Sequence, residues 1–200
     1  MTRLFNVSRV AGLAALTAGL PGMALAQCPT ADDLAGGIAF IGEHGEREVF
    51  TDLGDGMVTS SYRTQDGYSA EALLAHGVFL IELLDLVGTE GETRTSYEFP
   101  MDINDISIPM AGESWDVTVS VTDGENNVFE RQIYTYGAVE EHRYGPCAYD
   151  VIPFRIEYST APDVVETYHY LPALGLSYLY AYVDPVSDAT YPYSEVQALD

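Results

Sequence analysis

The sequence contains no lysine, so all eight of its basic residues are arginines, against 31 aspartates and glutamates. The formal net charge is −23. Nucleic-acid binding depends on cationic contacts to phosphate, and attachment to anionic lipid headgroups depends on basic clusters. The composition therefore argues against both functions. Two interpretations of the acidity stay open: it keeps the protein soluble, or it recruits cations or a basic partner.

Long apolar runs are also scarce. The clearest one, from Val10 to Leu20, follows two arginines and precedes an A-x-A sequence that ends at Ala26. This order predicts a signal peptide, Met1–Ala26, cleaved after Ala26, and hence a periplasmic or secreted protein. A membrane anchor is the alternative, but the run is shorter than the ~20 residues of a spanning helix. Lipid attachment at Cys28 is disfavoured because Gln27 is large and polar, and no later stretch is apolar enough to form a transmembrane segment.

The chain has two cysteines, Cys28 and Cys147, and both belong to the predicted mature protein. In an exported chain they predict one disulfide that ties the mature N-terminus to the last third of the sequence. Two free thiols, or a disulfide between chains, are the alternatives. No C-x-x-C sequence is present, which argues against redox catalysis.

Catalytic and cofactor motifs are missing as well. The sequence has no G-x-S-x-G, no H-E-x-x-H and no glycine-rich phosphate loop, and S-x-x-K is impossible without lysine. Two carboxylates can hydrolyse glycosides, but 31 acidic residues make any particular pair uninformative. We therefore predict a protein that is not an enzyme and has no cofactor.

Histidines and acidic turns give only weak signals for metal binding. The acidic loops lack the D-x-[DN]-x-[DN]-G spacing of a calcium loop, and Asp and Asn are ordinary turn residues. We therefore predict no metal site. The residues considered are His44, His76, His142 and His169, then Asp102, Asn104 and Asp105 in one loop and Asp123, Glu125 and Asn127 in another.

Most of the chain consists of short apolar stretches separated by turn residues. Trp115–Val121 is the clearest strand, with an apolar side chain at every second position. Gly54-Asp55-Gly56 and Asp123-Gly124 predict hairpins. Together the patterns predict an all-β fold with little helix: a single antiparallel curved sheet, either a half-barrel or an open barrel. The β-rich domain spans 27–183, and a tail, 184–200, is expected to be poorly ordered or draped on the surface.

Residues 69–87 allow two interpretations. Leucines and valines recur at helical spacing, but His76-Gly77 interrupts the pattern, and glycine is unfavourable inside a helix. Two strands are the favoured interpretation. Because Val78–Val87 is apolar on both faces, the second strand is expected to lie centrally in a sheet.

The last third, Cys147–Val183, predicts a three-stranded antiparallel meander that carries the core. Pro153 lacks an amide donor, so its strand is expected at an edge or at a bulge. Tyrosines are concentrated in this meander, and alternation places Tyr178, Tyr180 and Tyr182 on one face. They either fill the core or line a groove that holds an apolar ligand. The candidate ligand-binding residues are Tyr168, Tyr170, Tyr178, Tyr180 and Tyr182.

The run ETYHYLPALGLSYLYAY, at 166–182, places an aromatic pair, a proline and Leu-Gly before the last strand. It resembles the closing hairpin of periplasmic half-barrel proteins, the lipoprotein-carrier-like proteins and their uncharacterised relatives. This resemblance implies a curved antiparallel sheet with a hydrophobic concave face, although this chain is far more acidic.

Two functions follow as hypotheses. The first is a non-enzymatic binding or carrier module of the periplasm that takes an apolar small molecule or lipid. The alternative is a structural or envelope-interaction protein with a filled core and no small ligand.

Overall fold

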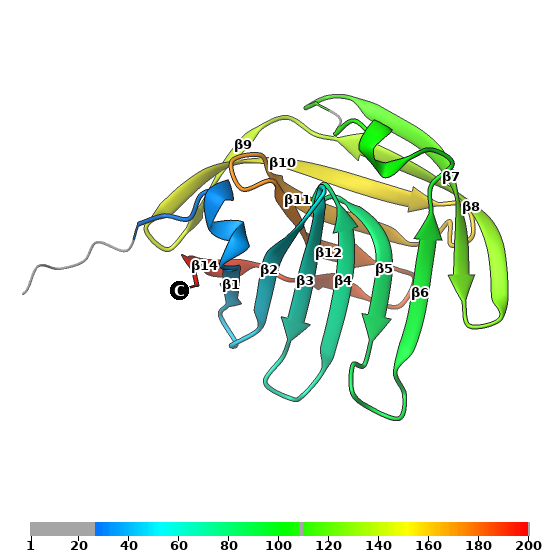
Figure 1. Cartoon of the computed structure of the whole chain (residues 1–200), viewed down its shortest axis with the longest axis horizontal. Coiled ribbons are helices and arrows are strands. Elements are labelled where there is room, and N and C mark those ends of the chain that lie inside the picture. The colour runs from blue at the N-terminus through cyan, green and yellow to red at the C-terminus, as the bar shows by residue number, and fades with distance from the viewer. Residues whose placement is uncertain (1–26, 109, 200) are drawn as a thin grey trace, which may run out of the picture.

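The computed structural model describes residues 27–108 and 110–199, so the predicted signal peptide lies outside the described residues. One antiparallel sheet of 14 strands accounts for most of the described chain, accompanied by two short 3₁₀ helices (Figure 1). The predicted all-β fold with little helix is confirmed. Among the described residues, no helix is long and apolar enough to cross a membrane. The elements are η1 (Ala31–Ala35), β1 (Ile38–Gly42), β2 (Arg47–Gly54), β3 (Met57–Arg63), β4 (Ser69–Ala75), β5 (Phe79–Asp85), β6 (Thr93–Glu98), η2 (Ile103–Asp105), β7 (Ser114–Asp123), β8 (Asn126–Tyr136), β9 (Glu140–Tyr144), β10 (Cys147–Tyr158), β11 (Val165–Leu171), β12 (Leu176–Val183), β13 (Asp188–Thr190) and β14 (Tyr193–Ala198).

The strand order explains how the sheet curves. Neighbours pair in the order β13-β12-β11-β10-β8-β7-β6-β5-β4-β3-β2-β1-β14, and β9 pairs with β10 alone. The two ends of this order, β13 and β14, follow each other in the chain with only Tyr191 and Pro192 between them. The three Cα–Cα steps from Thr190 to Tyr193 span at most about 11 Å, so the two end strands of the sheet must come close at this point. They do not pair with each other. We call the junction formed by β13, Tyr191-Pro192 and β14 the seam.

The prediction of a poorly ordered or draped tail at 184–200 is wrong for the residues that form the seam. β14 pairs with β1 through Ile38–Gly42, and β13 pairs with β12. Tyr193 and Val196 belong to the core. The sequence pattern does not predict these strands for two reasons: β13 is only three residues long, and β14 gains its hydrogen bonds from β1, at the opposite end of the described chain.

The turns agree with the predictions from sequence. Asp55 and Gly56, the two residues between β2 and β3, both adopt positive φ, as a tight two-residue hairpin turn requires, and Gly54 at the end of β2 does so as well. Asp123 faces Asn126 across the β7–β8 hairpin. Residues 69–87 form the strands β4 and β5 rather than a helix, and β5 lies in the interior of the strand order.

The hairpin tip between β4 and β5 contacts the tip between β11 and β12. The Gly77 carbonyl accepts hydrogen bonds from the Ser177 backbone N–H (2.7 Å) and from its hydroxyl (3.0 Å). A Cβ at Gly77 would lie 2.2 Å from the Gly175 carbonyl oxygen, and φ at Gly77 is +66°. Glycine is therefore required at the position that the sequence identified only as a helix breaker.

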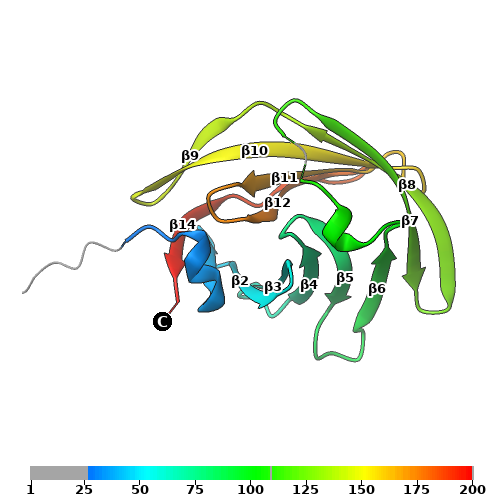
Figure 2. The same ribbon diagram turned by 45° about the horizontal axis from the view of Figure 1, so that its top comes forward.

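The β10–β12 meander carries the core, as predicted: β10 runs beside β11, and β12 follows on the other side of β11 (Figure 2). Val151 and Ile152 are neighbours in β10 but enter different clusters of buried side chains. The first cluster joins η1, β1–β4, β9–β12 and β14, and the second joins β4–β8, β10 and β11. Both faces of β10 are therefore covered at Val151 and Ile152. For this reason apolar residues follow one another there instead of alternating with polar ones.

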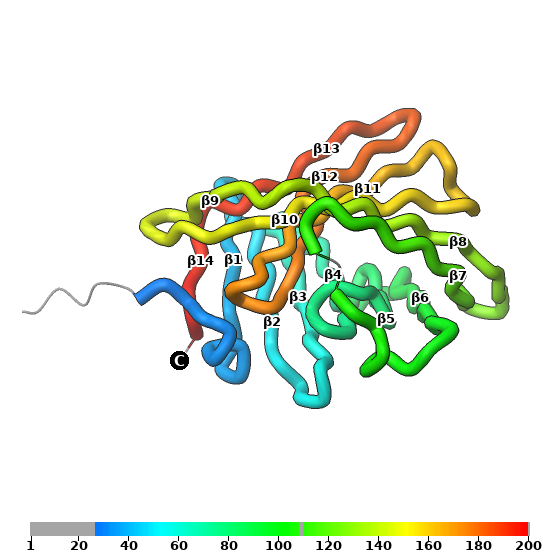
Figure 3. Tube along the Cα trace, turned by 90° about the horizontal axis from the view of Figure 1, so that it is seen from above, coloured from blue at the N-terminus to red at the C-terminus, as the bar shows by residue number. Residues whose placement is uncertain are grey.

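Pro153 lies where β10 changes partners. Residues 147–151 pair with β9, and residues 154–158 pair with β8. Proline has no amide hydrogen to donate. At Pro153 this causes no loss of a strand-pairing hydrogen bond, because the residue lies between the segment paired with β9 and the segment paired with β8. The sequence pattern does not predict β9, because four of its five residues, Glu140–Arg143, are polar or charged. Figure 3 shows the β9–β10 hairpin reaching over β14 and β1.

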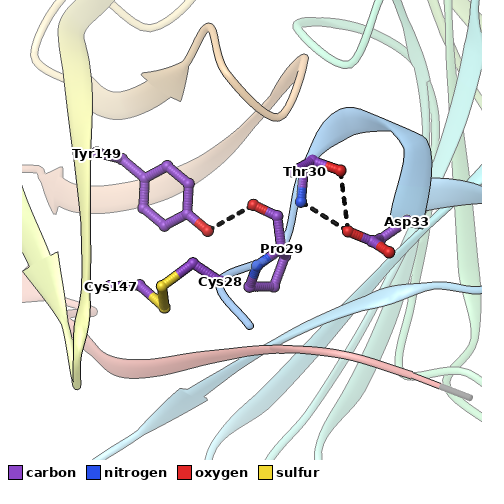
Figure 4. Close-up of a disulfide and its surroundings, with 6 residues drawn as sticks. All are labelled: Cys28, Pro29, Thr30, Asp33, Cys147 and Tyr149. Atoms are coloured by element: carbon purple, nitrogen blue, oxygen red, sulfur yellow. Dashed lines mark hydrogen bonds between the residues drawn. A yellow bond between two sulfur atoms is a disulfide. The ribbon is translucent and has the colours of Figure 1, made fainter. Parts of the chain in front are cut away.

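The two cysteines form the predicted disulfide, with an S–S distance of 2.11 Å and a Cα–Cα distance of 5.5 Å (Figure 4). It attaches the segment before η1 to the start of β10. Beside it, the buried Tyr149 hydroxyl donates to the Pro29 carbonyl at 2.7 Å. The Asp33 carboxylate accepts from the Thr30 backbone N–H and hydroxyl, which fixes the start of η1.

Candidate tyrosine and carboxylate site

The five predicted tyrosines do not share one face. Tyr168 pairs with Leu179, whereas Thr167 pairs with Ala181, so Tyr180 is the extra residue of a β-bulge. Tyr182 therefore lies opposite Glu166, on the face that carries Tyr168. The prediction that Tyr178, Tyr180 and Tyr182 point the same way is wrong, because a bulge reverses the alternation beyond it.

Most of these tyrosine rings are packed against other rings. Tyr178 is 2% exposed in the first cluster, and Tyr170 is 8% exposed in the second. Tyr168 stacks on Phe154, with ring centroids 5.2 Å apart, and Tyr180 stacks on His169 at 4.0 Å. The meander tyrosines thus contribute mainly to packing, and they do not form one open groove.

A buried chain of polar groups accompanies Tyr178. Its hydroxyl bonds to the Tyr144 hydroxyl at 2.9 Å and to His169 Nδ1 at 3.1 Å. The His142 ring lies edge-on to His169, 4.7 Å away. Burial, and secondarily the charge of His142, lowers the pKa of His169 from 6.5 to about 4. His169 is therefore neutral at neutral pH and acts as a hydrogen-bonding core residue.

Glu166 forms the centre of a second polar network. One of its carboxylate oxygens accepts from Tyr158 (2.6 Å) and from Tyr168 (2.7 Å). Close by in the sheet, Glu130 accepts from Gln132 at 2.9 Å and from the Thr160 hydroxyl. Neutral donors, rather than arginines, satisfy these two carboxylates.

Glu48 forms a third network, in the sheet beside the seam. Phe40, Glu48 and Tyr62 are directly paired across β1, β2 and β3, so their side chains share a face. The Tyr193 hydroxyl donates to Glu48 at 2.7 Å, and the Ser60 hydroxyl donates to its other oxygen. Burial raises the pKa of Glu48 above 4.5, although these two hydrogen bonds oppose the shift.

A surface pocket of about 190 Å³ lies where the seam meets the β1–β2 turn and β3. Burial, followed by the charges of Glu46 and Glu48, raises the pKa of Tyr62 to about 12. We call this hollow the seam pocket. It is lined by Glu43, His44, Glu46, Tyr62, Thr190, Tyr191, Pro192 and Tyr193.

A larger surface pocket, of about 350 Å³, lies between the β9–β10 hairpin and the β11–β12 tip. Tyr149 supplies the only aromatic ring among its lining residues, and Glu141 and Asp150 supply carboxylates. Tyr149 already donates its hydroxyl to Pro29. This pocket therefore offers fewer free recognition groups than the seam pocket.

The sequence did not point to the seam pocket. Tyr191 and Tyr193 lie beyond the predicted meander, and Tyr62 and Glu48 belong to no motif in the sequence. One signal was present: Phe50 is an inward residue of its strand, so Glu48, two positions earlier, was due to point inward as well. No short sequence pattern predicts that β2, β3 and β14 lie together.

Metal-binding geometry is not found in the described part of the chain, where no three His, Cys, Asp or Glu side chains converge. Asp102 uses its carboxylate to cap Asn104 in η2, as ordinary turn chemistry. Of the four histidines considered as metal ligands, His44 is the one that lines the seam pocket.

Comparisons with known proteins give no relative: no protein family, no curated protein and no solved structure matches this chain.

Proposed function

We propose that this protein is a non-enzymatic binding module of the periplasm that holds a small ligand with an apolar body in the seam pocket. The observation that carries the proposal is the position of Tyr62 and Tyr191. Both rings line an accessible hollow, whereas most of the meander tyrosines are packed inside clusters. Tyrosine combines an apolar ring with a polar tip, which suits binding of small organic molecules.

Export is part of the proposal. The disulfide between Cys28 and Cys147 agrees with an oxidising compartment, where such bonds persist. The predicted cleavage after Ala26 would leave Cys28 as the second residue of the mature protein. The resemblance of 166–182 to periplasmic half-barrel proteins points to the same compartment and stays a prediction.

Native mass spectrometry of protein isolated from the envelope of its own host tests the proposal. We expect a mature chain that begins at Gln27, contains one intact disulfide and carries a small molecule. The Tyr191→Ala variant is expected to lose that molecule, since Tyr191 is exposed and its ring lines the pocket. The matched control is Phe129→Ala, which removes a 77% exposed ring from β8. Ligand-free protein, or a ligand that Tyr191→Ala retains, contradicts the proposal.

A structural or envelope-interaction protein is the second candidate function. It is supported by the dense packing of the tyrosines: Tyr134, Tyr136, Tyr144 and Tyr178 are each 2% exposed. Such a protein needs no small ligand. It would emerge ligand-free from the same experiment and would bind none of the small organic probes described below.

A further inference from the structure

Resting on the proposed function, we infer that the seam pocket selects an organic cation, in particular a small alkylammonium group. Tyrosine rings and carboxylates line the same hollow, and no arginine does. The inference deepens the proposal by assigning the charge and chemical class of the ligand.

The rings supply the first part of the recognition. Three tyrosines from different parts of the fold line the pocket: Tyr62 from β3, Tyr191 from the segment between β13 and β14, and Tyr193 from β14. A cation near the face of an aromatic ring is attracted by the ring's quadrupole. Sets of aromatic rings are a known way of binding quaternary ammonium groups, whose charge is spread over methyl groups and is weakly hydrated.

Negative charge supplies the second part. Glu43 and Glu46 line the pocket, and His44 is the only basic side chain among the lining residues. The Glu46 carboxylate accepts from the His44 backbone N–H at 3.0 Å, which fixes its position in the β1–β2 turn. The raised pKa of Tyr62, caused by burial and then by Glu46 and Glu48, agrees with a negative potential at this place.

The floor of the pocket is preorganised. Tyr193 is 7% exposed, and its hydroxyl is engaged by Glu48 at 2.7 Å. The Phe40 ring lies 5.5 Å from the Tyr193 ring and supports it from the core. A ring held in this way needs little ordering when a ligand arrives, which favours binding.

The geometry favours an organic cation over a metal ion. Calcium requires six to eight oxygen ligands, whereas the described residues contain no convergent group of three acidic, histidine or cysteine side chains. The pocket volume of about 190 Å³ lies below the roughly 300–1,000 Å³ of sites for drug-sized ligands. A compact group such as trimethylammonium matches both limits.

A pair of isosteric probes separates charge from shape. Choline carries a trimethylammonium group, and 3,3-dimethylbutan-1-ol carries a neutral tert-butyl group of the same shape. Each is titrated into the folded protein and followed by NMR of the tyrosine ring protons. Tryptophan fluorescence is unsuited, because Trp115 packs against the second cluster. We expect choline to bind at least about tenfold more tightly than the alcohol.

Three variants locate the effect. Tyr191→Leu keeps an apolar side chain but removes the aromatic face, and we expect it to weaken choline binding about two- to fivefold. Glu46→Gln keeps an oxygen that accepts from His44 and removes one charge, with an expected loss of about fivefold. Glu125→Gln removes the same charge from the distant β7–β8 turn and is expected to leave the affinity unchanged (Figure 1).

The titrations of the two probes into the wild type and the variants either support or overturn the inference. Tighter binding of choline, weakened by Tyr191→Leu and Glu46→Gln but not by Glu125→Gln, supports the inference. Equal or tighter binding of the neutral alcohol overturns it and leaves the proposed binding function standing. If neither probe binds, or if Glu125→Gln weakens choline as much as Glu46→Gln does, the seam pocket is not a cation site. A bound molecule seen by native mass spectrometry then decides the proposed function separately.

Discussion

The meander and the seam use the same residue type in opposite ways. In the meander, Tyr178 is enclosed by other rings, and its hydroxyl is bonded to Tyr144 and His169. At the seam, Tyr191 is 36% exposed and faces a pocket lined by carboxylates. A tyrosine-rich sequence therefore does not identify a binding surface by itself; the position of each strand in the rolled sheet decides whether a ring is enclosed or accessible.

The largest expected effect concerns the covalent link to the meander. Replacing both Cys28 and Cys147 by serine is expected to reduce the free energy of unfolding by about 4–5 kcal/mol, because the disulfide closes a loop with a sequence separation of 119 residues. Urea denaturation measures the loss. Folded variant protein should still bind choline like the wild type, since neither cysteine lines the seam pocket. A change below about 1 kcal/mol would show that the meander cluster does not depend on this link.

A pair of tyrosine-to-phenylalanine variants sharpens the contrast between enclosed and accessible rings. Tyr178→Phe leaves buried partners on Tyr144 and His169 without their bond, and we expect a loss of about 1–3 kcal/mol. Tyr191→Phe removes an exposed hydroxyl and is expected to stay within about 0.5 kcal/mol of the wild type. Thermal or urea unfolding of both variants checks the ranking. Equal losses in the free energy of unfolding would contradict the distinction between an enclosed tyrosine in the meander and an accessible one at the seam.

The pH dependence of stability should differ between the two regions. His169 has a pKa of about 4 in the folded protein against an ordinary 6.5, so the unfolded chain binds its proton first. Its contribution is complete above pH 6.5 and is lost as the pH falls towards 4, by roughly 1–2 kcal/mol after allowance for solvent screening. In His169→Asn, this part of the acid destabilisation should disappear from urea-unfolding curves recorded across that range. The Phe129→Ala control, which removes an exposed ring that does not titrate, should keep the wild-type profile.

Glu48 is expected to act in the opposite direction. Burial raises its folded pKa, so its contribution is present below pH 4.5 and is lost as the pH rises through the folded value. Glu48→Gln should therefore gain stability relative to the wild type as the pH rises above 4.5, because the variant has no carboxylate to ionise in the core. Paired urea titrations at several pH values measure the difference. Glu46→Gln serves as the neighbouring control, and a pH-independent difference for Glu48→Gln would refute the mechanism.

Local pattern was enough to predict the elements whose hydrogen bonds are local. The β7–β8 hairpin follows from alternation in Trp115–Val121 and from the turn at Asp123-Gly124. The meander follows in the same way, because its three strands are joined by short turns. The pattern does not predict β13, which is only three residues long, or β14, whose partner β1 lies far away in the sequence.

The candidate site was harder to predict, for two physical reasons. A single extra residue at Tyr180 moved Tyr182 to the other face, and a bulge of this kind has no clear sequence signal when its residues are all apolar or aromatic. The seam pocket draws on residues as far apart as Glu43 and Tyr193. Their meeting depends on the curvature of the whole sheet.

The amino-acid sequence by itself determined the fold class, the acidity, the cysteine pairing and most of the turns, because alternation, charge and turn geometry act over a few residues. Only the tertiary structure decided which tyrosines are enclosed and which line a pocket. That choice depends on how far the sheet rolls before β13 and β14 approach each other, and the packing of side chains from distant strands sets that curvature.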